Sequence, residues 1–310
     1  MKHPVTVTSM LIVLFLAAQI IGLSLLSLNI TAVTEIDGSR VVEHATTALG
    51  DRPAIGGAMS LLYLVIGVAI GTSLVLLMIK YRFFGVWKAW FLLAIWISLT
   101  VALGVVLPTI LAAMIGLLCA LWKVYRPNPI IHNLVEVFMY AGLAVMLVPL
   151  FSIGWAILML LIISIYDVVA VWQSKHMVVM AEAQTKSNLF AGLYIPKRSS
   201  DQLREPSHPQ ASAVLADKNY ETKGSRSSSA ILGGGDIAFP LLFSGVVMDW
   251  LIISGSDTIV ALYATMIVSV SATLALALLF AFAKKDRYYP AMPFLSAGCL
   301  LGLGIIYFVV

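Results

Sequence analysis

Nine long runs of apolar residues fill most of this 310-residue chain. A helix needs about 20 apolar residues to cross the hydrocarbon core of a bilayer. Because a backbone in lipid has no water to bond, each run should be helical. Charged residues make up only 11% of the chain, against about 25% in soluble domains. We therefore predict an all-α membrane protein with nine transmembrane helices, at about 8–28, 56–79, 85–107, 108–125, 132–149, 152–173, 228–248, 257–282 and 290–310.

Basic residues are divided unevenly between the two sides of these predicted spans. Of the 19 Lys and Arg residues, 17 fall on the side of the N-terminus, and only Arg40 and Arg52 fall on the other side. An excess of Lys and Arg in short loops marks the cytoplasmic side. We therefore expect a multi-pass protein of the cell membrane, with its N-terminus in the cytoplasm and its C-terminus outside. Basic residues spread over several short loops, without interleaved aromatic residues, do not indicate nucleic-acid binding.

One long hydrophilic segment, at about 174–227, interrupts the apolar pattern. It is rich in Ser, Lys, Gln and Pro, a composition typical of disordered segments. Because it lies on the basic side, we expect a cytoplasmic loop that is largely disordered. The loop divides the chain into a six-helix part, residues 1–173, and a three-helix part, residues 228–310.

Apart from Asp257 at the first position of its span, three acidic residues lie within predicted spans: Glu136, Asp167 and Asp236. A charge at membrane depth costs about 2.5–3.5 kcal/mol on insertion scales, so each is a functional candidate. No Lys, Arg or His is predicted deep enough to be a buried partner. Glu136 lies near the cytoplasmic start of its span, where it can reach the interface or accept hydrogen bonds from His132 or Asn133. A structural role is therefore favoured for Glu136.

Asp167 and Asp236 are predicted to lie at matching depth. Asp167 precedes Lys175 by eight residues, which places it roughly 12 Å from the cytoplasmic end of its helix. Asp236 follows Arg226 by ten residues, or roughly 15 Å. The two helices are consecutive and antiparallel, so the carboxylates should meet.

Two neighbouring carboxylates do not both ionise easily and therefore share a proton. One can then activate a water molecule, while the other protonates a carbonyl oxygen or a leaving nitrogen. This division of labour is that of an aspartic protease. The alternatives for each aspartate are a hydrogen-bonded group between helices and a cation site.

Short motifs accompany the two aspartates and the last span. They are Tyr166-Asp167, Gly233-Gly234-Gly235-Asp236 and Tyr289-Pro290-Ala291-Met292-Pro293. Three glycines in one predicted helical turn each cost about 1 kcal/mol relative to Ala. They allow close packing of helices, or the close approach of a peptide that is to be cut. The two prolines are either simple signals of a helix start or hold a short non-helical stretch with unpaired backbone groups.

These motifs resemble those of the presenilin and signal peptide peptidase family of intramembrane aspartyl proteases. The match lies in Tyr166-Asp167, in Gly233-Gly234-Gly235-Asp236 with Gly234 at the variable position, and in Pro290-Ala291-Met292. Met292 replaces the family's Leu, a nearly volume-conserving change. The compact size and nine-helix plan are similar to those of archaeal presenilin homologues.

The resemblance implies that Asp167 and Asp236 are the catalytic pair. It implies that Pro290, Ala291 and Met292 help to hold the substrate, with support from Tyr166 and the three glycines. The substrates would be transmembrane helices of other proteins in the lipid bilayer, and no cofactor or metal would be needed. The basic loop favours the presenilin-like orientation, because signal peptide peptidases place this loop on the luminal side. Homo-oligomerisation and a need for accessory subunits stay open.

An ion-coupled transporter or cation channel that uses Asp167 and Asp236 as ligands is the main alternative. Transporters often show internal repeats and several broken helices, whereas this chain has no convincing repeat and one candidate break, at Pro290. Zinc and serine intramembrane proteases fit poorly, because the sequence has neither His-Glu-x-x-His nor Gly-x-Ser-Gly with a deep His. Its two cysteines, Cys119 and Cys299, form no Cys-x-x-Cys pair, so the sequence does not predict a zinc site of that type.

Overall fold

The computed structural model describes residues 5–36, 39–81, 83–126, 128–172, 191–195, 230–282 and 289–309. Within these residues, nine α-helices confirm the predicted helical plan. They are α1 (Val5–Leu28), α2 (Ala58–Lys80), α3 (Phe84–Gly104), α4 (Thr109–Tyr125), α5 (Pro129–Leu147), α6 (Ile153–Trp172), α8 (Gly234–Ile253), α9 (Thr258–Phe282) and α10 (Met292–Val309). Seven are long and apolar enough to cross a membrane, and α4 and α10 are shorter apolar helices.

Local sequence explains the tight joints between neighbouring helices. Pro108, which separates α3 from α4, has extended backbone angles (φ −56°, ψ 142°) and forms the N-cap of α4. Asn128 caps α5, and its side chain accepts a 2.9 Å hydrogen bond from the N–H of Ile130. Pro129 fills the first helical position, where its missing N–H costs nothing. A short 3-10 helix, Val148–Leu150, joins α5 to α6.

Within the described residues, four short strands accompany the helices of this mostly helical fold. β1 (Ile30–Ile36) and β2 (Ser39–His44) pair as an antiparallel hairpin between α1 and α2. β3 (Gly192–Ile195) and β4 (Ala230–Gly233) form a second antiparallel pair. β3 falls inside the predicted 174–227 loop, of which the structure describes residues 191–195.

The second pair of strands corrects the prediction for the seventh span. A helix was expected from about residue 228, but β4 occupies Ala230–Gly233 and α8 begins at Gly234. The backbone of β4 finds its hydrogen-bond partners in β3 instead of in a helix. Glycine is a poor helix former, so consecutive glycines offer little resistance to this change from strand to helix.

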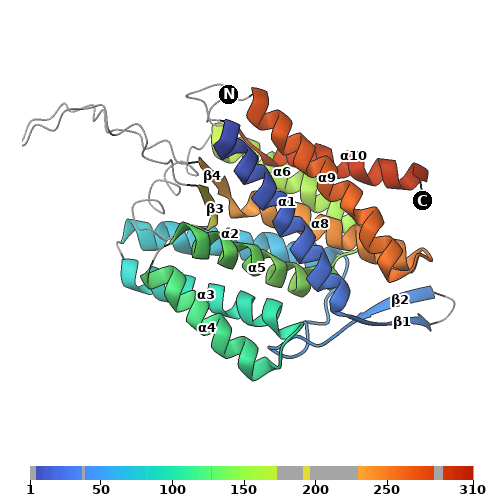
Figure 1. The fold of residues 1–310 in the computed structure, drawn as a ribbon, viewed down its shortest axis with the longest axis horizontal. Coiled ribbons are helices and arrows are strands. Elements are labelled where there is room, and N and C mark those ends of the chain that lie inside the picture. Colours follow the sequence, from blue (N-terminus) through green and yellow to red (C-terminus); the bar gives the residue numbers. More distant parts are fainter. Residues whose placement is uncertain are drawn as a thin grey trace, which may run out of the picture.

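The central helix of the bundle is α8. It packs against α1, α5, α6, α9 and α10, and Figure 1 shows it surrounded by these helices. Of its span, 72% is buried, compared with 11% for α2. Asp236 therefore lies at the start of the most enclosed of the candidate spans.

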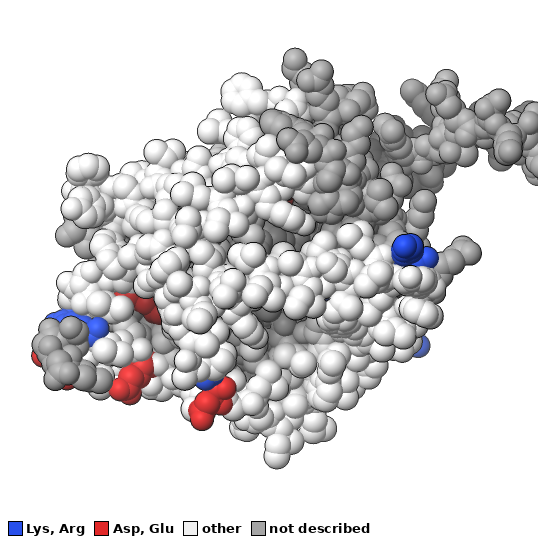
Figure 2. All heavy atoms as spheres, turned by 180° about the vertical axis from the view of Figure 1, so that it is seen from behind, with Lys and Arg blue, Asp and Glu red and all other residues white. Residues whose placement is uncertain are grey.

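The two ends of the bundle carry different elements. β3, β4 and the first turns of α1 lie toward one end, and the β1–β2 hairpin projects at the other (Figure 1). On the face shown in Figure 2, the visible Asp and Glu residues gather at the hairpin end together with some basic atoms, and further Lys and Arg residues lie at the opposite end. A broad, almost uncharged band separates them among the described residues. Such a band is what a hydrocarbon layer requires of a multi-pass protein.

Two glycines allow α10 to dock closely on α9. A Cβ atom on Gly298 would lie 2.8 Å from the carbonyl oxygen of Ser271, and one on Gly302 would lie 2.6 Å from Cα of Val268. Small residues four positions apart let two helix backbones approach each other in a membrane. This contact sets the position of α10, whose first residue reaches the candidate site.

Candidate active site

Asp167 lies near the end of α6 and faces the start of α10. Its Oδ2 atom accepts a 3.0 Å hydrogen bond from the backbone N–H of Met292, and the N–H of Ala291 also contacts this carboxylate. Only 4% of Asp167 is exposed. The first N–H groups of a helix lack intrahelical partners and carry partial positive charge. The start of α10 therefore compensates the buried carboxylate with backbone donors.

The residues before α10 explain why these donors are available. Tyr289, Pro290 and Ala291 are not helical, and α10 begins only at Met292. Pro290 is buried and has no N–H of its own. Pro290 therefore lies in a short non-helical stretch against protein, whereas Pro293 is the second residue of α10, a position where proline is a signal of a helix start.

Asp236 is the third residue of α8 and is partly buried. Gly233, the N-cap, is extended (φ −62°, ψ 148°) and turns the chain from β4 into the helix. Its backbone N–H contacts the Asp236 carboxylate, and a Cβ atom at Gly233 would lie 3.3 Å from Oδ2 of Asp236. The junction between strand and helix therefore determines where this second carboxylate points.

Gln19 of α1 supports the first turn of α8 and was not identified from the sequence. Its Nε2 atom donates a 3.1 Å hydrogen bond to the carbonyl oxygen of Ile237, and the residue is completely buried. Pro240 lies inside α8 and has no N–H to offer the carbonyl group of Asp236. The first turn of α8 is therefore stabilised partly by a side chain of another helix, α1. A lone amide in an otherwise apolar span was the available sequence signal.

Asp167 and Asp236 are close enough for their carboxylates to interact electrostatically. They come from adjacent antiparallel helices, α6 and α8, which pack against each other. Two neighbouring carboxylates repel each other when both are ionised, so one shared proton is the favoured arrangement. Such a pair can serve as base and acid within a single site.

The three glycines before Asp236 differ in their surroundings, contrary to the expectation of one glycine-rich helical turn. Gly233 ends β4, whereas Gly234 and Gly235 begin α8. A Cβ atom at Gly234 would lie 2.5 Å from Oη of Tyr140, but one at Gly235 would make only ordinary contact, at 3.4 Å, with the ring of Phe239. Gly234, at the variable position of the motif, is therefore the glycine that has no room for a side chain.

Tyr166 precedes Asp167 on α6 and is 39% exposed, so much of its side chain lies on the surface of the helix bundle. One turn before Asp167, the hydroxyl groups of Ser164 and Ser296 lie 2.7 Å apart and link α6 to α10. This contact was not identified from the sequence, because serine is common in transmembrane helices and has no distinctive spacing here.

Glu136 has a buried basic partner, so the prediction that no Lys lies deep enough is wrong. Lys123 of α4 is 4% exposed, and its Nζ atom contacts Oε1 of Glu136, which is fully buried. Lys123 lies in the last turn of its own helix, and the sequence therefore placed it at the interface. Packing of α4 against α5 encloses it. His132 lies 3.9 Å from the same carboxylate oxygen, and Asn133 bonds to β3 instead.

The described residues contain no group of three or more His, Cys, Asp or Glu side chains placed to hold a metal ion. The site itself consists of the two carboxylates, the backbone N–H groups at the start of α10 and the glycine-rich junction before α8.

Comparisons with known proteins bear on both the fold and the family. A family model described as signal-peptide peptidase, presenilin aspartyl protease matches residues 17–310. A solved structure of a presenilin family intramembrane aspartate protease in the P2 space group is 18% identical in sequence to this chain, with a TM-score of 0.59. The match covers 97% of this chain and 97% of that one. A second such structure, in the C222 space group, is 17% identical with a TM-score of 0.55, over 95% of this chain and 94% of that one. The curated proteins give no match.

The two structures share the fold of this chain, and the family model covers nearly its whole length. The apolar helices in the described part of the chain agree with a multi-pass membrane protein. The chain belongs to the signal-peptide peptidase and presenilin aspartyl protease family and is an intramembrane aspartyl protease.

Proposed function

We propose that Asp167 and Asp236 are the catalytic pair and that they hydrolyse peptide bonds within transmembrane helices of membrane-protein substrates. The observation that carries this proposal is the packing of α6 against α8, which places the two carboxylates within electrostatic range of each other. Donation from Met292 to Asp167 supports it, because it holds one carboxylate in a defined orientation. An ion carrier would not require this hydrogen bond between an acidic side chain and the start of α10. Membership of the protease family also favours the protease.

In the proposed reaction, the ionised carboxylate takes a proton from a water molecule as the water oxygen attacks the scissile carbonyl carbon. The protonated carboxyl group gives its proton to the carbonyl oxygen, so a neutral tetrahedral diol forms. The carboxyl group that took the proton of the water then gives it to the leaving nitrogen as the C–N bond breaks, and the other carboxylate takes a proton from one diol hydroxyl, which restores the singly protonated pair. Because the two acids titrate as a pair, the roles of base and acid belong to the pair and not to one residue.

The ladder of β3 and β4 leaves one edge of β4 directed away from β3. The N–H and C=O groups of Gly192 and Tyr194 bond to side chains of α5. Backbone groups of successive strand residues point to alternate sides. Leu193, between these two residues, therefore directs its backbone groups toward β4 and pairs with Leu232. Ile231 and Gly233 therefore direct their backbone groups to the other side, where the N–H of Gly233 contacts the Asp236 carboxylate.

We propose that an unwound substrate segment pairs with this edge of β4 as an added strand. Its scissile bond would then lie beside Asp236, and Gly235 would leave room for its backbone, since no close contact fills the Cβ position there. Gly233 and Gly234 would shape the same junction. On the opposite side, Pro290, Ala291 and Met292 would line the path together with Tyr166.

We further propose that the enzyme lies in the cell membrane with its N-terminus and the 174–227 segment in the cytoplasm and its C-terminus outside. The distribution of the 19 basic residues supports this orientation. Because β3 and β4 lie at the same end as the start of α1 (Figure 1), the proposed site would draw its water from the cytoplasmic side.

Purified protein in detergent or proteoliposomes, incubated with a transmembrane peptide, tests the catalytic pair. Asp167→Asn and Asp236→Asn keep the shape of the side chain but remove its acid, and each should abolish cleavage. Asp51→Asn, at an exposed carboxylate on the hairpin side, is the matched control and should cleave normally. Product masses identify the cut position. Full cleavage by either active-site variant, with a melting temperature like that of the wild type, would overturn the assignment.

A further inference from the structure

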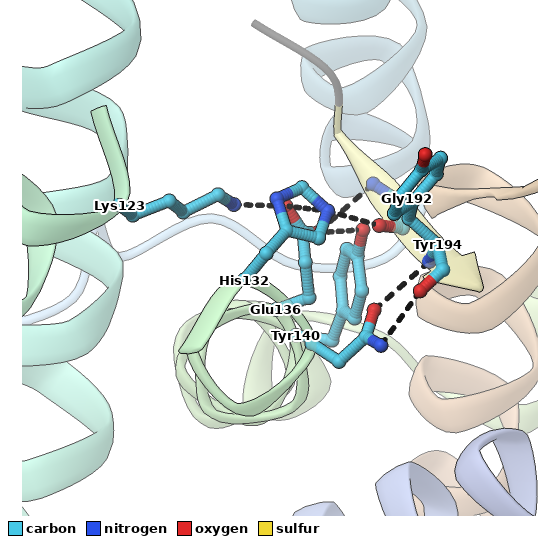
Figure 3. Close-up of polar contacts among 7 residues, drawn as sticks. Lys123, His132, Glu136, Tyr140, Gly192 and Tyr194 are labelled. Carbon is cyan, nitrogen blue, oxygen red and sulfur yellow. Dashed lines mark hydrogen bonds and ion pairs between the residues drawn. The ribbon is translucent and has the colours of Figure 1, made fainter. Parts of the chain in front are cut away.

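A buried polar cluster joins α4 and α5 to β3, beside the start of α8. We call it the Glu136 cluster; its side chains are Lys123, His132, Asn133, Glu136 and Tyr140. Figure 3 shows Lys123 reaching in from one side, with Gly192 and Tyr194 of β3 on the other and Glu136 between them. Buried ionisable groups in a membrane protein are costly, so their retention calls for a reason.

Glu136 is the centre of this cluster and uses both of its carboxylate oxygens. Oε1 contacts Nζ of Lys123, and Oε2 accepts hydrogen bonds from the hydroxyl group of Tyr140 and from the backbone N–H of Gly192, the latter at 3.1 Å. Glu136 is completely buried. One side chain therefore connects α4, α5 and β3.

Side chains of α5 take the place of a neighbouring strand along β3. Asn133 donates from Nδ2 to the carbonyl oxygen of Tyr194 at 2.8 Å and accepts from the N–H of Tyr194 at 2.9 Å. His132 bonds to the carbonyl oxygen of Gly192 at 2.8 Å. Together with Glu136, they bind four backbone groups on one edge of β3 (Figure 3). The other edge of β3 pairs with β4, so this contact also sets the position of β4.

Tyr140 forms a second, shorter path from the cluster to the site. Glu136 accepts the hydrogen bond of its hydroxyl group, and the same Oη atom would lie 2.5 Å from a Cβ on Gly234. Tyr140 is 2% exposed. Gly234 is two residues from Asp236. Glu136 is therefore connected to the junction between β4 and α8 in two ways, through the paired strands β3 and β4 and through Tyr140.

We infer that Glu136 is a positioning residue for Asp236, acting through β3 and Tyr140 without touching the substrate. The inference rests on the proposed role of Asp236 as a catalytic acid. A purely stabilising ion pair would not need this geometry, because apolar residues often replace buried pairs without loss of stability. The contacts to Gly192 and Tyr140 require an acceptor at Oε2, whereas the contact to Lys123 compensates the charge of that acceptor.

Two double variants separate positioning from ion pairing. Both remove the two charges together, because a single change would leave an unpaired buried charge. Lys123→Met with Glu136→Gln keeps an amide oxygen that can accept from Tyr140 and Gly192. Lys123→Met with Glu136→Leu has similar volume but no acceptor. Steady-state cleavage of a transmembrane peptide gives kcat and KM for both, and thermal unfolding gives the folded fraction.

The Leu double variant should lose up to about 100-fold in kcat, the scale expected for misplaced catalytic groups, with little change in KM. The Gln double variant should recover most of this loss. If both variants have the kcat of the wild type, or if both lose activity only in proportion to unfolding, Glu136 does not position Asp236. Tyr140→Phe removes a single hydroxyl group and should lower kcat in a protein that folds normally; an unchanged kcat would contradict the path through Tyr140.

Asp236→Asn in the same assay distinguishes failure of this inference from failure of the proposed function. An inactive Asp236→Asn with a fully active Leu double variant overturns the positioning role alone. A fully active Asp236→Asn overturns the catalytic assignment and the inference that depends on it.

Discussion

The backbone N–H of Met292, the first residue of α10, donates a 3.0 Å hydrogen bond to Oδ2 of Asp167 near the end of α6. The two residues are 125 positions apart in the chain. The orientation of one proposed catalytic carboxylate therefore depends on where α10 docks. A hydrogen bond to a charged group contributes about 1.5–3 kcal/mol, enough to select one rotamer of a side chain.

Removing this one donor should impair catalysis without unfolding the protein. Met292→Pro deletes the N–H, and proline is well tolerated at the first position of a helix. We expect kcat to fall at least about tenfold, since loss of a charge-assisted hydrogen bond of about 1.5–3 kcal/mol has this scale. Met292→Leu keeps the N–H and the side-chain volume and is the control. Equal kcat values for the two variants would show that the donor does not matter to the reaction.

Docking of α10 on α9 gives a second prediction. Gly302→Ala would place Cβ 2.6 Å from the backbone of Val268, which cannot rotate away, whereas Gly304→Ala meets nothing within 4 Å. Overpacking costs about 1–3 kcal/mol, so Gly302→Ala should lower the melting temperature and, by moving Met292, the cleavage rate. Gly304→Ala should leave the melting temperature unchanged or raise it, since alanine is a better helix former. Identical melting curves would contradict close packing of α9 and α10.

The contact between Gly234 and Tyr140 predicts a specific rescue. Gly234→Ala should reduce activity, because the new Cβ would meet Oη of Tyr140 at 2.5 Å. Adding Tyr140→Phe removes that atom, so the double variant should be more active than Gly234→Ala alone. A double-mutant cycle in kcat measures this coupling, which for residues in contact is about 0.5–3 kcal/mol. Strict additivity would mean that the two side chains do not interact in the working enzyme.

Arg52 holds the chain together at the hairpin end. Its guanidinium group donates to the carbonyl oxygens of Ala45 (2.7 Å) and Val145 (3.0 Å) and to Oδ1 of Asn29 (2.8 Å). Burial lowers the pKa of Arg52 below its ordinary value, and the attraction of Asp249 partly offsets this effect. The group links the loop before α2 to the ends of α1 and α5.

Replacing Arg52 by Met should destabilise the fold by about 2 kcal/mol or more, because buried acceptors left without a donor cost about 1–3 kcal/mol each. A lowered pKa in the folded state means that stability would rise with pH only in the strongly alkaline range where guanidinium groups titrate. The loss in melting temperature should therefore be the same from about pH 5 to 9, where Arg stays protonated. A loss that varies over this range would indicate another titrating group. Cleavage by the folded fraction should persist, since Arg52 lies far from β3 and β4.

Much of the architecture could be predicted from the sequence because it depends on local properties. The length of an apolar run decides whether it can span a bilayer, and α1 through α10 follow the predicted order of spans. The matched placement of Asp167 and Asp236 followed from counting residues along two antiparallel helices. Their catalytic role stays a prediction, although the structure brings the two carboxylates to one site.

The strands β3 and β4 could not be predicted, because strands of four residues have little stability of their own. Their backbone groups are satisfied by each other and by Asn133, His132 and Glu136, which lie far away in the sequence. The partner of Glu136 was missed for the same reason. Lys123 ends its own helix, and only the packing of α4 against α5 encloses its ammonium group.

The sequence by itself determined that this chain is a bundle of membrane-spanning helices carrying two aspartates on neighbouring spans, because hydrophobic length and charge are properties of the chain. Only the tertiary structure decided that α8 begins at Gly234, that Met292 bonds to Asp167 and that Tyr140 leaves no room at Gly234. These features depend on which backbone and side-chain groups meet after the helices have packed.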